Sequence, residues 1–260
     1  MIDAAVLDHV AVAVERWDDA WPRLVGELGG RWVSGGESIG FAPGQVAFAN
    51  GMRVEVLAPA AVEQNDFLRR FLDSSGPGPH HLTFKVPDLS AALAEVEAAG
   101  FDPVGVDLRD PTWKEAFLHP KQARGVVVQL AEAYGDWQSA PPPGFPTPAD
   151  PPSSLDHVAH AVADLDDGLA LFAGLLGGEE RERGEDEGAR WVELAWPGPG
   201  RVRVVAPTAS SSPVATALAG RRGRVHSLAF TVPGLPAGPP RVVEPGEDLG
   251  VRLVLRPPSG

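Results

Sequence analysis

The 260-residue chain is 43% hydrophobic and 22% charged, which is typical of a globular protein. It contains no cysteine, which excludes disulfides and thiolate metal sites, and its net charge of −13 argues against general nucleic-acid binding. The N-terminus MIDAAVLDHVAVAV lacks the basic segment of a signal peptide, and no apolar run is long enough to cross a bilayer. We therefore expect a cytoplasmic protein that binds neither nucleic acid nor a membrane.

The first half of the chain predicts two successive units with the same order of elements. LDHVAVAV (7–14) predicts a strand, WDDAWPRLVGELGG a helical stretch that stops at glycine, and RWVSGG, QVAFAN and RVEVLAP three short strands. HLTFKV then predicts the first strand of the second unit, and DLSAALAEVEAAG predicts a helix that is capped by Asp88 or Ser90 and closed by Gly100. Three further strands follow in FDPVGVDL, WKEAFLHP and GVVVQLAEA. Each unit therefore reads β-α-β-β-β.

The whole arrangement returns 148 residues later. LDHVAVAV at 7–14 matches LDHVAHAV at 155–162, and the same shift aligns LGG at 28–30 with LGG at 176–178. Between the copies, SAPPPGFPTPADPPSS is too rich in proline for regular pairing and favours an extended, semi-rigid spacer. We predict a module at 1–137, a Pro-rich linker at 138–154 and a second module at 155–260.

Aligning the two units of the first module pairs its polar strand residues. His9 falls on His81 at a shift of 72, and Glu55 falls on Gln129 at a shift of 74. Side chains alternate along a strand, so His81 and its neighbour His80 face opposite ways, and the repeat selects His81. Buried polar side chains need partners. Two imidazoles, a carboxylate and an amide oxygen that converge on one point would suit a divalent metal and leave positions open for water or substrate.

These residues carry a family resemblance. DHVAVAV, VEVLAP, GPHHLTFKVPD and FLHPK…GVVVQL resemble the vicinal oxygen chelate superfamily, which includes glyoxalase I, extradiol dioxygenases, bleomycin resistance proteins and methylmalonyl-CoA epimerase. The resemblance implies an α+β fold of tandem modules built from paired βαβββ units. It also implies one divalent metal ion, of the class Zn, Mn, Co, Ni or Fe(II), with ligands on the first and last strands of each unit. They match His9, Glu55, His81 and Gln129.

The closest local resemblance, over residues 7–132, is to the epimerase, and the chain departs from it in two ways. Glu55 and Gln129 have exchanged places relative to the epimerase pattern. The positions that match the epimerase base, around Phe41 to Gly44, contain no carboxylate. We therefore do not expect methylmalonyl-CoA epimerisation.

The second module lacks the ligand set. His157 matches His9, but Arg203 replaces Glu55, Ser227 replaces His81 and Val254 stands where Gln129 would. Its last unit is shortened, because PGLPAGPP occupies the place of a helix. We predict a degenerate copy that binds no metal.

The predicted function is glyoxalase- or epimerase-like Lewis-acid chemistry on a small oxygenated metabolite, in a lyase or isomerase that is a monomer or homodimer. Glu55 is a candidate ligand and proton shuttle, and Glu115 is a candidate second acid or base. One alternative is an Fe(II)-dependent dioxygenase of extradiol type, with His9, His81 and Glu55 as the ligands. Another is a drug- or metabolite-binding resistance protein without chemistry.

Overall fold

The structure is a computed structural model that describes residues 1–135, 137–186 and 188–258. Proximity of the backbone groups these residues into two compact units. One unit contains 1–8, 81–135 and 157–226, and the other contains 9–80, 137–156 and 227–258. The module boundaries expected from the sequence, at 137 and 155, stay a prediction. Among the described residues, no helix is long and apolar enough to span a membrane.

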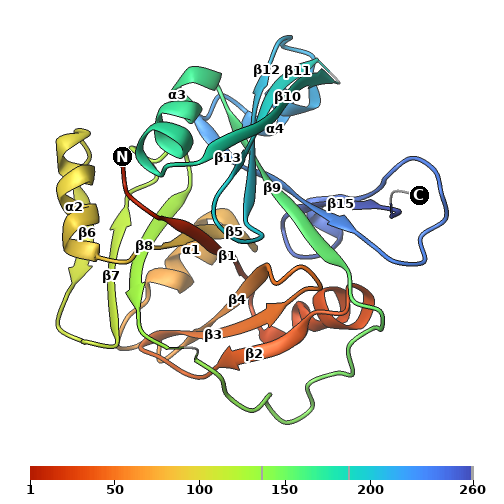
Figure 1. Cartoon of the computed structure of the whole chain (residues 1–260). Coiled ribbons are helices and arrows are strands. Elements are labelled where there is room, and N and C mark those ends of the chain that lie inside the picture. Colours follow the sequence, from red (N-terminus) through yellow and green to blue (C-terminus); the bar gives the residue numbers. More distant parts are fainter. Residues whose placement is uncertain (136, 187, 259–260) are drawn as a thin grey trace. The chain divides into compact units, whose positions relative to one another are not determined.

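Eight strands of the first predicted module form one mixed sheet (Figure 1). They are β1 (Val6–Ala13), β2 (Arg31–Gly35), β3 (Gly40–Ala47), β4 (Arg53–Ala60), β5 (Gly78–Lys85), β6 (Pro103–Asp107), β7 (Trp113–Leu118) and β8 (Val127–Ala133). Their order across the sheet is β2-β3-β4-β1-β5-β8-β7-β6. β1 pairs with β4 in parallel, as β5 does with β8, so the first and last strands of each βαβββ unit are neighbours.

Strands of the second predicted module form a seven-stranded sheet. They are β9 (Ser154–Val162), β10 (Glu179–Asp186), β11 (Ala189–Ala195), β12 (Arg201–Pro207), β13 (Gly223–Thr231), β14 (Arg241–Val243) and β15 (Arg252–Arg256). Their order is β10-β11-β12-β9-β13-β15-β14. Residues 232–240 form turns and bends instead of a helix. The predicted fold class, with tandem βαβββ modules and a shortened last unit, is confirmed.

The helices follow the predicted order with two differences in detail. In the first module they are η1 (Trp17–Asp19), η2 (Pro22–Glu27), α1 (Phe67–Ser75) and α2 (Leu89–Ala98), and in the second they are α3 (Leu165–Leu169), η3 (Ala170–Leu175), α4 (Pro213–Leu218) and η4 (Pro245–Glu247). Asp88 caps α2 by accepting a hydrogen bond from the amide of Ala91. The stretch expected as one helix after β1 is a 3₁₀ turn followed by a π-helix. Helix α1 was not predicted.

Helix α1 covers one face of β1 and β4. Its Leu68 and Leu72 pack against Ala11 and Ala13 of β1 and against Leu57 of β4. Alanine is small enough to let a helix approach a sheet closely. Ala11 and Ala13 are two and four residues from His9, and Leu57 is two residues from Glu55, so they share the faces of these polar residues. The helix therefore lies on the strand face that carries the two polar residues.

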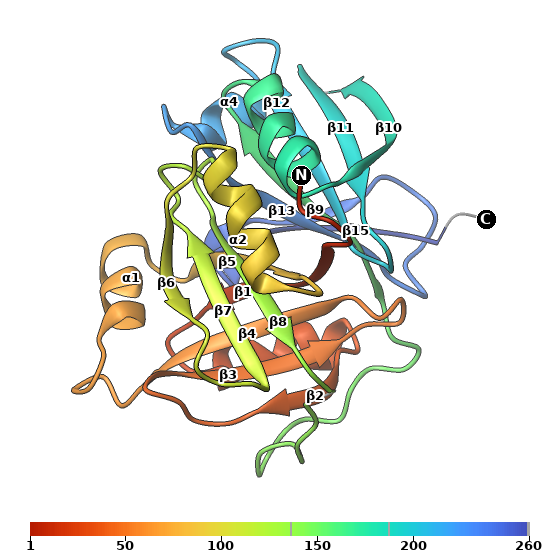
Figure 2. The same cartoon turned by 60° about the vertical axis from the view of Figure 1, so that its left-hand side comes forward.

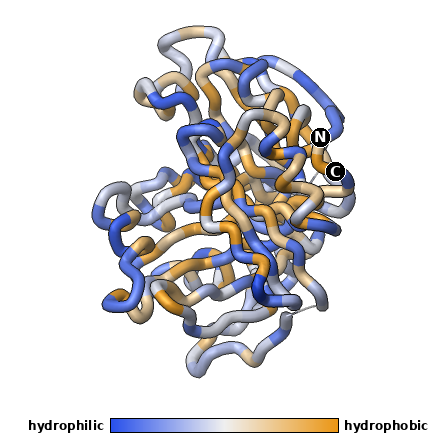
Figure 3. Tube along the Cα trace, turned by 90° about the vertical axis from the view of Figure 1, so that its left-hand side faces the viewer, coloured by the Kyte–Doolittle hydropathy of each residue, from blue (hydrophilic) through white to orange (hydrophobic). Residues whose placement is uncertain are grey.

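Helix α2 covers β6, β7 and β8, which lie side by side (Figure 2). It buries Leu89, Ala92 and Val96. Hydrophobic (orange) and hydrophilic (blue) stretches alternate along the chain trace (Figure 3). The sheets and their covering helices thus supply the hydrophobic cores.

The described residues of the predicted Pro-rich linker have no helix or strand before β9, and two of them make specific contacts with the first module. Ser139 pairs with β2, because its amide donates to the Val33 carbonyl and its hydroxyl accepts from the amide of Gly35. Further along, Phe145 packs edge-on against Trp21 and Trp32. These contacts hold the linker against β2 and η2, so it is not a free spacer.

Candidate metal centre

His9 and Glu55 are brought together by the parallel pairing of β1 and β4. In this register Glu55 lies beside Ala11, which is two residues from His9 and therefore on the same face. His9 Nε2 is 3.6 Å from Glu55 Oε2, and the side chains are only 2% and 11% exposed. A buried carboxylate next to an imidazole forms a partly negative site, which is the environment that attracts a cation.

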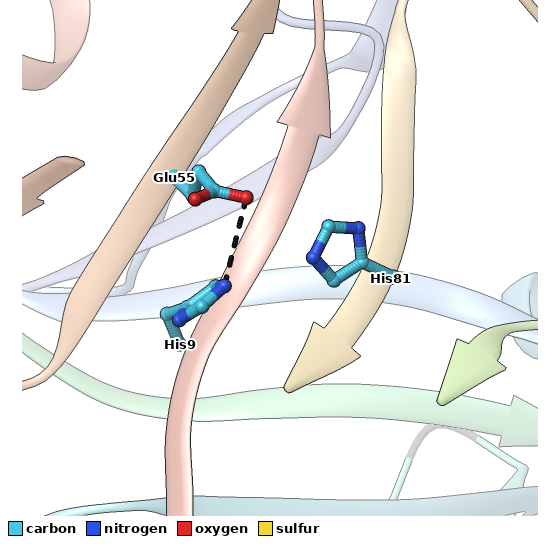
Figure 4. A group of neighbouring side chains, drawn as sticks. All are labelled: His9, Glu55 and His81. Atoms are coloured by element: carbon cyan, nitrogen blue, oxygen red, sulfur yellow. Dashed lines mark ion pairs between the residues drawn. The ribbon is translucent and has the colours of Figure 1, made fainter. Parts of the chain in front are cut away.

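His81 completes a group of three. One ligand atom from each of His9, Glu55 and His81 lies within 4.8 Å of the other two, and all three residues are buried. Figure 4 shows the ring of His81 directed from β5 toward the other two side chains. Ligands about 2.1 Å from one ion lie roughly 3 to 4 Å apart, so small side-chain movements would suffice to bind it. Neutral imidazole and carboxylate oxygen are suitable donors for a divalent transition metal.

Gln129 lies on β8, the strand next to β5. It pairs in register with Thr83, which is two residues beyond His81 and so shares its face. Gln129 Oε1 accepts a hydrogen bond from the Thr83 hydroxyl over 2.6 Å, and its Nε2 donates to Glu115 over 2.7 Å. Gln129 is only 7% exposed. Because an amide oxygen has two lone pairs, this one retains a position for a metal.

Glu115 is held by two donors on the same sheet. Its Oε2 accepts from Gln129 Nε2 and, over 2.9 Å, from the indole Nε1 of Trp113. The residue predicted as a second acid or base is therefore one hydrogen bond away from a predicted ligand. Nearby Lys114 instead pairs with Glu132 over 2.6 Å, and the pKa of Glu132 is lowered to about 2 by the amide of Leu89 and by Lys114. Lys114 is thus engaged in a structural ion pair.

The sequence did not indicate two polar neighbours of the candidate ligands. One is Thr83, described above. The other is Gln45 on β3, which pairs in register with Glu55 and donates from Nε2 to Glu55 Oε1 over 3.0 Å. The available signal was the polar Gln45 in β3, the strand before the one that carries Glu55. This signal becomes informative only when the antiparallel register of β3 and β4 is known.

His80 occupies a different environment from His81. Its ring packs edge-on against Phe67 and Phe71 of α1. Burial lowers the pKa of His80 to about 4, although the nearby Glu55 carboxylate acts in the opposite direction. His80 is therefore neutral at pH 7 and lies near the carboxylate, yet it is not one of the three clustered residues. The choice of His81 over His80 as ligand remains a prediction.

Comparisons with known proteins bear on the family and the fold. Residues 8–117 match the family described as Glyoxalase/Bleomycin resistance protein/Dioxygenase superfamily. Over 137 residues the chain is 31% identical to the uncharacterized protein YqjC of Bacillus subtilis (strain 168), which covers 50% of this chain and 94% of that protein.

Two solved structures are also similar. A mutant of 4-hydroxymandelate synthase from Streptomyces coelicolor superposes with a TM-score of 0.65 at 16% identity and covers 88% of this chain and 71% of the synthase. Methylmalonyl-CoA epimerase from Mycobacterium tuberculosis has a TM-score of 0.45 at 28% identity and covers 50% of this chain and 89% of the epimerase. The first of these shows that the tandem fold extends over most of the chain.

Proposed function

The chain belongs to the glyoxalase/bleomycin resistance protein/dioxygenase superfamily, and on that premise we propose that it is a divalent-metal-dependent enzyme. The observation that carries the proposal is the buried group His9, Glu55 and His81, whose ligand atoms lie within 4.8 Å of one another. We assign these three residues and Gln129 as the metal ligands. Four protein ligands leave two positions of an octahedral ion for a substrate.

A bound divalent ion would act as a Lewis acid on two neighbouring oxygens of a small metabolite. The side chains of this chain have their own roles. Gln45 holds one oxygen of Glu55 in place, and Thr83 orients the amide of Gln129. Glu115 accepts or returns a proton at its carboxylate, where it is already fixed by Trp113 and Gln129. Such a set supports proton transfer next to a carbonyl, as in a lyase or isomerase.

The proposal does not include methylmalonyl-CoA epimerisation. β3 contains no carboxylate from Phe41 to Gly44, and these residues pair with β4. An epimerase needs a base on each side of the carbon acid, whereas the polar residue that β3 offers beside Glu55 is the amide of Gln45.

A dioxygenase of extradiol type is the second candidate. It is favoured by one observation, namely that the clustered residues are two histidines and one carboxylate. This is the ligand set of non-haem Fe(II) oxygenases. Oxygen uptake with Fe(II) and candidate catechols separates the two functions, because a Lewis-acid enzyme consumes no O₂.

Elemental analysis of protein purified without chelator or nickel resin tests the main proposal. We expect one divalent metal per chain, with His81→Ala abolishing retention and His119→Ala, a change at an exposed histidine, leaving it intact. Failure to bind Zn, Mn, Co, Ni or Fe(II) after reconstitution would refute metal dependence. Tight binding of an aromatic drug without turnover would then favour a sequestering protein.

A further inference from the structure

The second sheet reproduces the local geometry of the candidate metal centre with different charges. Arg203 on β12 lies beside Ala159 of β9, as Glu55 lies beside Ala11 of β1. Glu193 on β11 pairs in register with Arg203, as Gln45 pairs with Glu55. Each of these residues follows its counterpart in the first sheet by 148 positions.

These residues form a compact ionic cluster. Glu193 Oε2 accepts hydrogen bonds from Arg203 Nη2 over 2.8 Å and from Arg203 Nε over 3.2 Å. The same oxygen is 3.5 Å from His157 Nδ1. The guanidinium of Arg203 also lies over the ring of Trp191, with 4.0 Å between the guanidinium carbon and the ring centroid. The three polar side chains are between 5% and 19% exposed.

The two centres carry different charges, because the residues at equivalent positions differ. In the first sheet Glu55 is a carboxylate whose cross-strand partner, Gln45, is neutral, so the pair carries a formal charge of −1. In the second sheet the carboxylate stands on the other strand of the same pair, and Arg203 neutralises it. A buried carboxylate without a positive partner is costly, so each centre needs a cation.

We propose that the guanidinium of Arg203 fills in the second sheet the role that a divalent metal fills in the first. The guanidinium supplies the positive charge and binds the carboxylate of Glu193. It also stacks on Trp191, a contact that a guanidinium can make through its planar face. The second centre is therefore a metal site in which the cation has become part of the chain. Restoring the charge pattern of the first sheet should turn it back into a site for a divalent metal.

The double substitution Glu193→Gln with Arg203→Glu tests this, because it copies the Gln45–Glu55 pair beside His157. The matched control is Glu193→Gln with Arg203→Gln, which removes both charges without providing a carboxylate. We expect the double variant with Arg203→Glu to bind one more Zn²⁺ or Co²⁺ per chain than the control, measured by elemental analysis after dialysis. The comparison is a difference of one, so it holds whatever the first centre binds.

Arg203→Ala provides a second measurement if the charge exchange prevents folding. It leaves His157 and Glu193 facing each other without a cation. In a His81→Ala background, we expect Zn²⁺ to raise its Tm, whereas the same background with Arg203 intact shows no Zn²⁺-dependent shift. Equal metal content in the folded Glu193→Gln, Arg203→Glu variant and its control, or equal Zn²⁺ responses with and without Arg203, would overturn the inference. The inference rests on the proposed function: a first centre that binds no metal in wild type refutes the proposed function, whereas the two comparisons above test the second centre by itself.

Discussion

Replacing Gln45 by leucine keeps the size of the side chain and removes its hydrogen bond to Glu55 Oε1. A hydrogen bond to a charged group contributes about 1.5–3 kcal/mol. Because Gln45 is half-buried, water will partly replace it, and the lower end of that range applies. A loss of about 1.5 kcal/mol lowers the Tm of a domain of this size by roughly 3–6 °C.

The larger effect is expected on metal binding. Side chains that orient metal ligands typically contribute about 10–100-fold to affinity. Isothermal titration of the metal-free protein with Zn²⁺ measures this loss, and a Co²⁺ absorption spectrum reports any change in ligand geometry. The control is Gln64→Leu, since Gln64 also faces a carboxylate, that of Glu63, but both are exposed. Affinity and Co²⁺ spectrum unchanged in Gln45→Leu would refute the role assigned to this amide.

Three further outcomes are expected. His81→Ala should abolish metal retention and His80→Ala should leave it nearly intact; the reverse result would mean that the strand register is off by one residue. Glu115→Gln should retain the metal but lose about 10²–10⁴-fold in proton exchange with a true substrate, and wild-type protein should exchange the α-proton of methylmalonyl-CoA in D₂O only slowly. Burial lowers the pKa of His160 to about 4, below its ordinary value of 6.5. The fold therefore has its full stability above pH 6.5, where the ring is neutral in both states, and about 3 kcal/mol is lost as the pH falls toward 4. Urea unfolding at pH 7 and pH 4.5 should therefore show a smaller pH dependence in a folded His160→Gln variant than in wild type.

The internal repeat made the fold and the clustering of His9, Glu55 and His81 predictable. Equivalent positions in repeated units of a sheet lie on equivalent strands, so matching His9 to His81 also matched their faces. The chemistry of the four residue types then suggested a metal. The match needed a shift of 72 residues for the histidines and of 74 for Glu55 and Gln129, so it depended on recognising equivalent strands on either side of a two-residue difference in length.

The features that were missed depend on contacts between strands or segments. Gln45 and Thr83 acquire their roles from cross-strand neighbours, which the sequence of one strand does not reveal. Helix α1 consists of the short segment FLRRFLDSS. Its mixture of charged and apolar residues is too short to distinguish a helix from a loop by periodicity. The linker composition predicted an extended chain, but its anchoring depends on Trp21 and Trp32, more than a hundred residues away.

The orientation of Gln129 bears on which reaction the centre supports. Glu115 is an acceptor when ionised, so the amide nitrogen of Gln129 must face it, and the amide oxygen must face the donating hydroxyl of Thr83. The orientation of the amide is therefore fixed by its neighbours. If the amide oxygen of Gln129 is a fourth protein ligand, as proposed, fewer positions on the ion would remain for external ligands than with two histidines and one carboxylate alone. Ligation by Gln129 would therefore favour the proposed Lewis-acid chemistry over the dioxygenase alternative.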